Sequence, residues 1–393
     1  MTTGELTHSE HPARQFGIRV LIWQSRQLIR LPYLLKPVTE TLLAGFRAAH
    51  GVHIMSGHGT RHRAEFDAFY GNASMLGRGD VFIWIGLTMD HVPWRALRER
   101  GVRCILYQTE PTHRCMARSS GAFAVDELWD FSHHNIEACR RRGVDAPALR
   151  YVPLAAVRGP VASRPRDCTV GRPLIFFGNK YDGPLRKRCW DALRAALPKR
   201  VYSTYRIWDD ASFVAEVLNQ FDLFVNLDKD CGDAHGPVTF RNARLLNAGK
   251  LIISERMHPA DEAEYAGMLL LANNMSHIAS LYLQLIQSGD WCERADAAAL
   301  AFRKKFGPRD VFARARIYRD FLLTPRHSAT RRHARTALMR RALADAVHSR
   351  DDIQHGSNVE RHGAPLPCDG FNHGTLAALC HSVQGSLPAA PSG

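Results

Sequence analysis

The sequence predicts an α/β protein with two tandem Rossmann-like, doubly wound domains and a C-terminal tail. Three observations support this fold class. Short, almost continuously apolar runs alternate with helix-like segments, as expected of parallel strands covered on both faces. The alternation stops at 155–172, a stretch rich in Pro, Gly and Arg, and then restarts. The 393 residues are 45% hydrophobic and 23% charged, which excludes collagen-like, coiled-coil and wholly disordered chains.

The first domain is expected over 16–155. Its apolar runs predict strands at Ile18–Trp23, Val52–Met55, Val81–Leu87, Arg103–Tyr107, Glu127–Phe131 and Tyr151–Leu154. Helical periodicity predicts helices at Val38–His50, Trp94–Arg100 and Asn135–Arg142. A glycine follows two of these helices and leads into the next segment, which is a helix C-cap signal. Repeated βαβ units of this kind form an open parallel sheet.

The second domain is expected over 173–325 and repeats the pattern. Strands are predicted at Leu174–Phe177, Tyr202–Tyr205, Asp222–Leu227, Leu251–Ser254 and Met268–Ala272. Helices are predicted at Pro184–Leu197, Ala211–Gln220, Val238–Ala248 and Ile278–Ile286, with helical patterning to Leu323. Proline at the first position of a helix, as at Pro184, is favourable because that position needs no N–H donor.

Residues 326–393 are predicted to form a basic helix, over 328–348, and then a disordered tail. Beyond 349 the chain is rich in Gly, Pro, Ser and His and has few large apolar side chains to bury. Metal-ligand residue types do occur there, but their spacing is loose and no metal site is expected; they are Cys368, His373, Cys380 and His381.

Charge and targeting signals narrow the class of partner and the compartment. The net charge of +14 fits phosphorylated small molecules, an anionic lipid surface or nucleic acid. No apolar run approaches the ~18 residues of a membrane span, and the N-terminus lacks the apolar core of a signal peptide. Nine scattered cysteines without a CxxC pair indicate reduced thiols. We therefore expect a cytoplasmic protein, with peripheral contact at the inner face of an anionic membrane as a further option.

Function should lie in the loops that follow the strands, because ligands bind at the carboxyl ends of parallel strands. Neither domain has GxGxxG after its first strand, and the chain has no GxxxxGK[ST], which disfavours dehydrogenases and P-loop kinases. The turn at Gly178 and Asn179 leads instead into a helix that begins with Arg186, Lys187 and Arg188. Backbone N–H groups and guanidinium groups there suit a diphosphate, although an exposed basic helix face would look the same.

A second basic helix follows the strand that ends in Asn226. It carries Arg241 and Arg244 at i and i+3, ends at Gly249, and feeds a buried strand that leads to Ser254 and Glu255. The block RNARLLNAGKLIISE resembles the C-terminal, donor-binding domain of GT-B glycosyltransferases, in particular the family 1-like proteins of bacteria and algae. The order FFGN, basic helix, FVNLD, arginine helix and IISE is similar over about 150 residues, whereas the first domain agrees in outline only.

The resemblance implies a two-domain glycosyltransferase that moves a sugar from a nucleotide-diphosphate sugar to a hydroxyl acceptor, for example of a bacterial cell-surface or secreted glycan. It implies no cofactor other than the donor. Combined with the strand-end pattern, it predicts donor-binding residues at Gly178, Asn179, Arg186, Arg188, Asn226, Arg241, Arg244 and Ser254.

The chain departs from the family where many retaining enzymes carry two glutamates eight residues apart. Gly236 and Arg244 stand at those positions, so the stereochemical outcome stays open and Arg244 could contact a phosphate. An inverting transfer needs a general base, for which Glu110 at a strand exit is the first candidate and His58 the second. Glu255 is the other candidate catalytic residue, as an acceptor of hydrogen bonds from donor hydroxyls. Its alternative role is structural, a cap-like contact to the following segment from Met257 to Asp261.

Other features favour structural interpretations. Asp228 and Asp230 spell the D-x-D of a metal site, but this fold normally uses basic side chains, so no metal is predicted. His133 and His134 are expected to open a helix as polar residues. The basic helix at 331–341 lacks interleaved aromatic residues, which disfavours nucleic acid. A GT-B protein that binds a nucleotide or glycan without catalysis remains the alternative function. Three tryptophans are expected in the core: Trp84, Trp129 and Trp190.

Overall fold

A computed structural model describes most of the two predicted domains. The described residues are 17–24, 32–58, 63–86, 92–109, 125–141, 148–160, 162, 166, 168, 172–181, 183–204, 207, 209–228, 239–321 and 323. The chain divides after Arg326, and all described residues belong to the first unit. The predicted tail with its basic helix and its Cys/His cluster, and the candidate base Glu110, lie outside the described residues.

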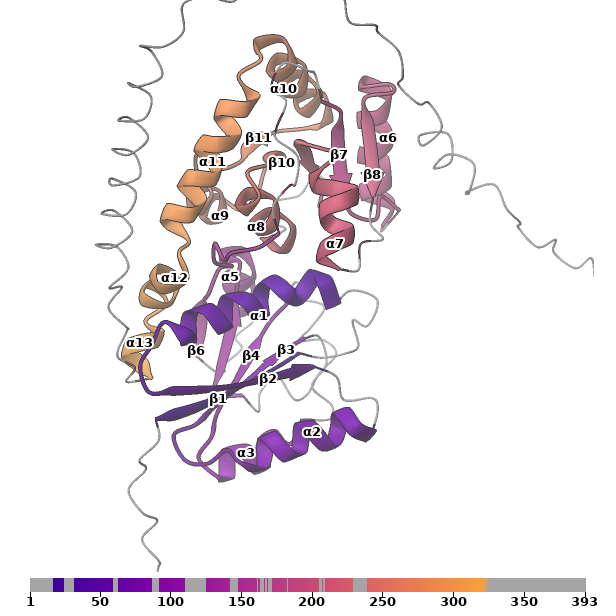
Figure 1. The fold of residues 1–393 in the computed structure, drawn as a ribbon. Helices are drawn as coiled ribbons and strands as arrows, with labels where there is room; N and C mark the ends of the chain where they lie inside the picture. The colour runs from indigo at the N-terminus through magenta and orange to yellow at the C-terminus, as the bar shows by residue number, and fades with distance from the viewer. Residues whose placement is uncertain are drawn as a thin grey trace, which may run out of the picture. The chain divides into compact units, whose positions relative to one another are not determined.

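The first sheet is parallel throughout and has the strand order β2-β1-β3-β4-β5-β6. Helix α1 lies on one face of this sheet, and α2 and α3 lie on the other (Figure 1). Val20 and Ile22 pack with the α1 side, whereas Leu21 and Trp23 pack with the α2 side. Because both faces are covered, the strands are apolar at successive positions. The bounds are β1 Ile18–Gln24, β2 Val52–His58, β3 Val81–Ile85, β4 Arg103–Tyr107, β5 Glu127–Asp130, β6 Ala148–Tyr151, α1 Pro32–Arg47, α2 Arg63–Ser74, α3 Trp94–Glu99 and α5 His133–Arg141.

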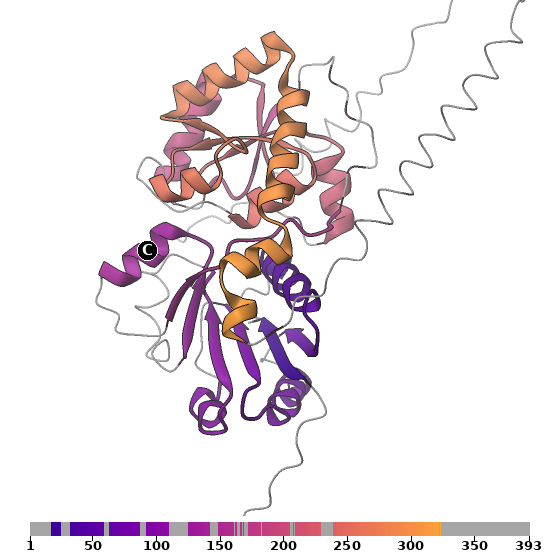
Figure 2. The same cartoon turned by 90° about the vertical axis from the view of Figure 1, so that its left-hand side faces the viewer.

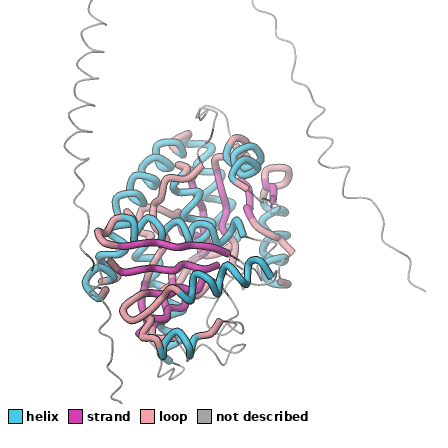
Figure 3. The backbone as a smooth tube through the Cα atoms, turned by 60° about the horizontal axis from the view of Figure 1, so that its bottom comes forward, coloured by secondary structure: helices cyan, strands magenta, loops and turns pink. Residues whose placement is uncertain are grey.

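The second sheet is also parallel, in the order β11-β10-β9-β7-β8. Helices α6 and α10 cover one face and α8 covers the other, so helices lie on both sides of the strands (Figure 3). A π-helical turn, Val214–Leu218, continues α7. The bounds are β7 Leu174–Phe177, β8 Val201–Thr204, β9 Leu223–Asn226, β10 Leu251–Glu255, β11 Leu270–Ala272, α6 Pro184–Ala196, α7 Asp210–Phe213, α8 Thr239–Asn247, α9 Pro259–Glu264 and α10 Met275–Ser288.

The last helices return to the first sheet. Helix α11 (Trp291–Lys305) packs against α8 and β10, and α12 (Pro308–Arg314) and α13 (Ile317–Asp320) then lead back to the first sheet. On α12, Phe312 packs edge-on against Phe46 of α1, with ring centroids 4.9 Å apart. The hydroxyl of Tyr318 donates a hydrogen bond to the carbonyl of Gly45 at 2.9 Å. Figure 2 shows α12 and α13, in orange, beside the strands of the first sheet.

The two parallel sheets confirm the predicted α/β class with tandem doubly wound domains. Strands β4 and β7 have the predicted bounds. The strand predicted at Tyr151–Leu154 is instead β6, Ala148–Tyr151, because these residues pair with β5, whereas the apolar residues after Tyr151 are buried without strand pairing. Helix α2 was not predicted, although Phe66, Phe69, Tyr70 and Ala73 stand at helical spacing in it.

The prediction that all cysteines are reduced is wrong. Cys168 in the linker and Cys292 on α11 form a disulfide across 124 residues of sequence. Arg166 holds the same linker by donating to the carbonyls of Gly249 and Cys292. The fold thus brings the linker against α11, a proximity that scattered positions in the sequence cannot indicate. Cys189 is also disulfide-bonded, whereas Cys104 and Cys139 are buried thiols, as expected.

Several smaller predictions are confirmed. The three tryptophans are buried in the core, and His133 and His134 are the first two residues of α5. Within the described residues, no helix has the length and apolar character to span a bilayer.

Candidate functional site

The carboxyl ends of β7, β9 and β10 form the candidate site. From β7 the chain first winds outward to β8 and then crosses to the other side of β7, where β9 lies. The boundary between β7 and β9 is therefore a topological switch point, which is where open α/β sheets bind their ligands. Most of the predicted donor-binding residues lie at this point.

Arg241 of α8 lies at the centre of the site. Its Nη1 donates to Oδ1 of Asn226 at 2.8 Å, and its guanidinium lies 4.9 Å above the ring of Phe176. The residue is buried, and among the described residues no carboxylate forms an ion pair with it, although the charge of Asp228 acts on it from a greater distance. Burial first, and then the charge of Arg186, lowers the pKa of Arg241 to about 9. A buried cation held by a neutral amide favours an incoming anion.

Arg186 of α6 approaches the same place from the other side of β7. It is buried, and its Nε donates to the carbonyl of Asp228 at 3.1 Å. Its Nη1 donates to the carbonyl of Asn179 at 3.3 Å. The guanidinium lies 5.7 Å from the Phe176 ring centroid, so Phe176 contacts both arginines. The structure therefore brings Arg186 and Arg241 together beside the Gly178–Asn179 turn, as predicted.

Two neutral residues join the ends of β9 and β10. Nδ2 of Asn226 donates to Oγ of Ser254 at 3.1 Å, and both side chains are buried. Because the amide oxygen of Asn226 accepts from Arg241, one chain of hydrogen bonds links α8, β9 and β10. This chain fixes the direction of the Arg241 guanidinium.

Glu255 is the last residue of β10, and its carboxylate is 5% exposed. Its Oε2 accepts a hydrogen bond from the backbone N–H of Asp228 at 2.7 Å. The alternative role considered for Glu255, a contact to the segment that follows it, falls to Glu262, whose Oε1 accepts from the N–H of Met257 at 2.8 Å. Glu255 therefore orders the backbone two residues after β9, at the edge of the site.

Two predicted residues lie elsewhere. Arg188 is exposed on α6, whereas Arg186 on the same helix is buried. Arg244 is buried, but its Nη1 lies 3.5 Å from Oδ1 of Asp210 on α7, not beside Arg241. Its charge also acts on Glu40 of α1, where it partly offsets the burial that raises the pKa of the Glu40 carboxyl.

A metal site is not supported in the described part of the chain. Asp228 is described, Asp230 is not, and no group of three His, Cys, Asp or Glu side chains there is arranged to hold an ion. Of the two candidate bases, Glu110 lies outside the described residues, and for His58 only the backbone, at the end of β2, is described.

Sequence reasoning missed a buried polar network at the end of β5. Oδ2 of Asp130 accepts from Nε2 of Gln108 at 2.8 Å, and Oδ1 accepts from the N–H of Ser132 and from Nδ2 of Asn135. Burial raises the pKa of Asp130 well above its usual range, which these hydrogen bonds only partly counter. The sequence does carry one signal of this network: the carboxyl of Asp130 stands between two apolar residues at the end of a strand.

Asp261 of α9 was missed as well. It is fully buried, and its carboxylate accepts from the Oγ of Ser132 at 2.9 Å. The same carboxylate accepts from the N–H groups of His133 and His134, at 2.8 and 3.1 Å. It therefore caps the start of α5 and couples the first sheet to α9.

No protein-family model matches the chain, and no curated protein does. Several solved structures overlay on it. Sucrose-phosphate synthase from Thermosynechococcus elongatus is 13% identical, with 78% of this chain and 99% of that chain covered and a TM-score of 0.49. A trehalose-6-phosphate synthase is 11% identical, with 78% and 100% covered and a TM-score of 0.48. HepE from Anabaena, in complex with UDP-glucose, is 9% identical, with 77% and 100% covered and a TM-score of 0.48. At these values no residue role is transferred.

Proposed function

We propose that the chain is a GT-B glycosyltransferase that binds a nucleotide-diphosphate sugar at the ends of β7, β9 and β10. The observation that carries this proposal is the pair of buried guanidiniums, Arg186 and Arg241, at the switch point of the second sheet. Charge-assisted, forked hydrogen bonds from arginine match the oxygens of a diphosphate. The proposal also rests on the resemblance of the sequence blocks that supply these residues.

In this mechanism the bond between the anomeric carbon and the diphosphate breaks while the acceptor oxygen bonds to that carbon. Negative charge develops on the departing diphosphate, and Arg186 and Arg241 are already oriented to stabilise it. Glu255 would accept hydrogen bonds from donor hydroxyls. Glu110 would take the proton of the acceptor hydroxyl if the reaction inverts.

The donor is the only small molecule that this proposal requires, and the acceptor we propose is a hydroxyl of a cell-surface or secreted glycan. A cytoplasmic location, with contact at the inner face of the membrane, stays a prediction from the sequence.

One observation favours the second candidate, a GT-B protein that binds its ligand without catalysis. Arg244 stands where many retaining enzymes carry a glutamate, and it is buried beside Asp210. A carboxylate is therefore absent from that position, and the basic side chain there is engaged on α7.

Calorimetric titration with a panel of UDP-, GDP- and dTDP-sugars tests the binding part of the proposal. We expect one base to bind saturably, with affinity lost in Arg241→Met. Chromatographic detection of free nucleoside diphosphate and glycosylated acceptor then separates an enzyme from a binding protein. If no member of the panel binds, the site does not serve a nucleotide sugar.

A further inference from the structure

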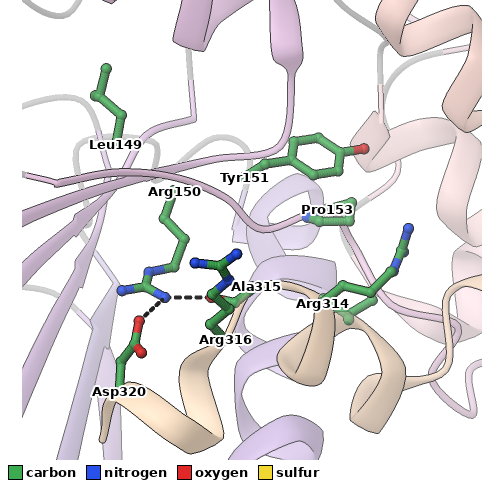
Figure 4. Close-up of a pocket in the computed structure, with 9 residues that line it drawn as sticks. Leu149, Arg150, Tyr151, Pro153, Arg314, Ala315, Arg316 and Asp320 are labelled. Carbon is green, nitrogen blue, oxygen red and sulfur yellow. Dashed lines mark hydrogen bonds and ion pairs between the residues drawn. The ribbon is translucent and has the colours of Figure 1, made fainter.

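A second pocket, of about 330 Å³, lies between β6 and the turn that joins α12 to α13 (Figure 4). Residues of β6 and of the segment after it line one side of the pocket, and three of the lining residues are arginines: Arg150, Arg314 and Arg316. None of these residues belongs to the candidate donor site at β7, β9 and β10.

Two of the three arginines are held in place by protein groups. Arg150 is mostly buried; its Nε donates to Oε2 of Glu127 and its Nη1 to Oδ2 of Asp320, each at 2.9 Å. Arg314 donates from Nη1 to Oε2 of Glu264 at 3.1 Å. Both side chains are therefore held in place, but each of these carboxylates also pairs with another cation, so the frame around the pocket stays basic.

Arg316 differs from both. Its side chain is exposed and has no hydrogen-bond or ion-pair partner among the residues that the structure describes. The acid that lines the pocket, Asp320, is already engaged through both oxygens, by Arg150 and by Arg319. Figure 4 shows the Arg316 guanidinium next to Arg150 and Ala315. The pocket thus carries a net positive charge, to which Arg316 contributes without a counter-charge among the described residues.

The backbone at Arg316 is also unusual. Its φ of 58° and ψ of 18° place it in the left-handed region, which glycine adopts freely and an arginine adopts at a cost in free energy. This conformation sets the direction in which the side chain leaves the turn between the two helices. An arginine at this position therefore costs backbone stability and, in the described structure, gains no ion pair in return.

We propose that this pocket binds the phosphate group of a small phosphorylated compound, with Arg316 as the residue that engages it. A phosphate oxyanion would supply the missing counter-charge and accept a forked pair of hydrogen bonds from the guanidinium. The pocket volume of about 330 Å³ leaves room for the organic part of a phosphomonoester beside the phosphate group. Inorganic phosphate and a phosphomonoester share this chemistry.

The test is calorimetric titration of the full chain with inorganic phosphate and, separately, with glycerol 3-phosphate, at constant ionic strength. Arg316→Gly removes the guanidinium and at the same time relieves the backbone, so the variant should fold at least as stably. We expect its affinity for the bound probe to fall tenfold or more. Lys199→Gly is the matched control, because Lys199 also has positive φ and one positive charge but does not line the pocket.

Arg241→Met separates this pocket from the candidate donor site, where a phosphate could also bind. We expect phosphate binding to persist in Arg241→Met and Lys199→Gly and to fail in Arg316→Gly. Tighter binding of glycerol 3-phosphate identifies an organic phosphate, and equal binding identifies the phosphate group itself as the ligand. Unchanged affinity in Arg316→Gly, equal loss in Lys199→Gly, loss confined to Arg241→Met, or no binding of either probe to the wild type would each overturn the proposal.

Discussion

A β-carbon at position 178 would lie 2.6 Å from Nη2 of Arg241. Glycine at the end of β7 therefore leaves the space in which the buried guanidinium reaches Asn226. Glycine is needed here for more than backbone flexibility. Because Gly178 has no side chain, α8 can place the Arg241 guanidinium at the strand ends. The two residues are 63 positions apart and act as one unit.

We expect Gly178→Ala to displace Arg241, because a contact under 3 Å cannot be accommodated without movement. Nucleotide-sugar affinity, measured by calorimetry, should fall at least tenfold while the fold is retained. Gly71→Ala is the matched control: nothing lies within 4 Å of its added β-carbon inside α2, so stability should rise by about 0.5–1 kcal/mol with binding unchanged. Equal binding by both variants would contradict the role of the turn.

Removal of the Arg241 guanidinium should weaken donor binding directly. We expect Arg241→Met to bind the nucleotide sugar about ten- to a hundredfold more weakly, since charge-assisted hydrogen bonds contribute roughly 1.5–3 kcal/mol. Its melting temperature should stay level or rise, because a buried cation without an ion pair in the described structure is replaced by an apolar chain. Arg188→Ala on the exposed face of α6 is the control and should bind normally.

Glu255→Gln tests the carboxylate at the end of β10. The amide keeps an oxygen for the N–H of Asp228, so the variant should fold and melt like the wild type. If the negative charge of Glu255 strengthens its hydrogen bonds to the donor hydroxyls, activity should fall by about 10²-fold. Full activity in this variant would remove Glu255 from the catalytic residues, and a lower melting temperature with activity retained would make its role structural.

Asp130 should make stability depend on pH. Because its folded pKa is raised, mainly by burial, the group favours folding when protonated. That contribution is complete below the unfolded value near ~4 and is lost as the pH rises through the folded pKa. Urea unfolding from pH 4 to 8 should therefore show the wild type losing stability relative to Asp130→Asn as the pH rises. Parallel profiles for the two proteins would contradict this assignment.

The disulfide between Cys168 and Cys292 should stabilise the fold through the long loop that it closes. Its sequence separation is 124, and loops of this length restrict the unfolded chain strongly. We expect the double variant Cys168→Ser, Cys292→Ser to lose about 2–4 kcal/mol in urea unfolding under oxidising conditions. Identical stability with and without the two cysteines would show that the bond contributes nothing in solution.

The sequence by itself determined the class of the fold and most of its elements. The strands Arg103–Tyr107 and Leu174–Phe177 can be predicted directly from local apolar runs, because a strand that is buried on both faces is apolar at successive positions. Gly101 and Gly249 were predicted as helix ends, and both have positive φ just after α3 and α8. Such signals depend on neighbouring residues, so they can be recognised without the tertiary structure.

Only the tertiary structure decided which side chains meet. Arg241 and Arg244 share one helix at i and i+3, yet the first reaches β9 and the second reaches Asp210 on α7. The disulfide and the Asp261 cap on α5 join segments more than a hundred residues apart. These pairings depend on how helices pack against the sheets, and packing contacts between distant segments leave no period or spacing in the sequence. The elements are therefore set by local preference, and the composition of the site is set by packing.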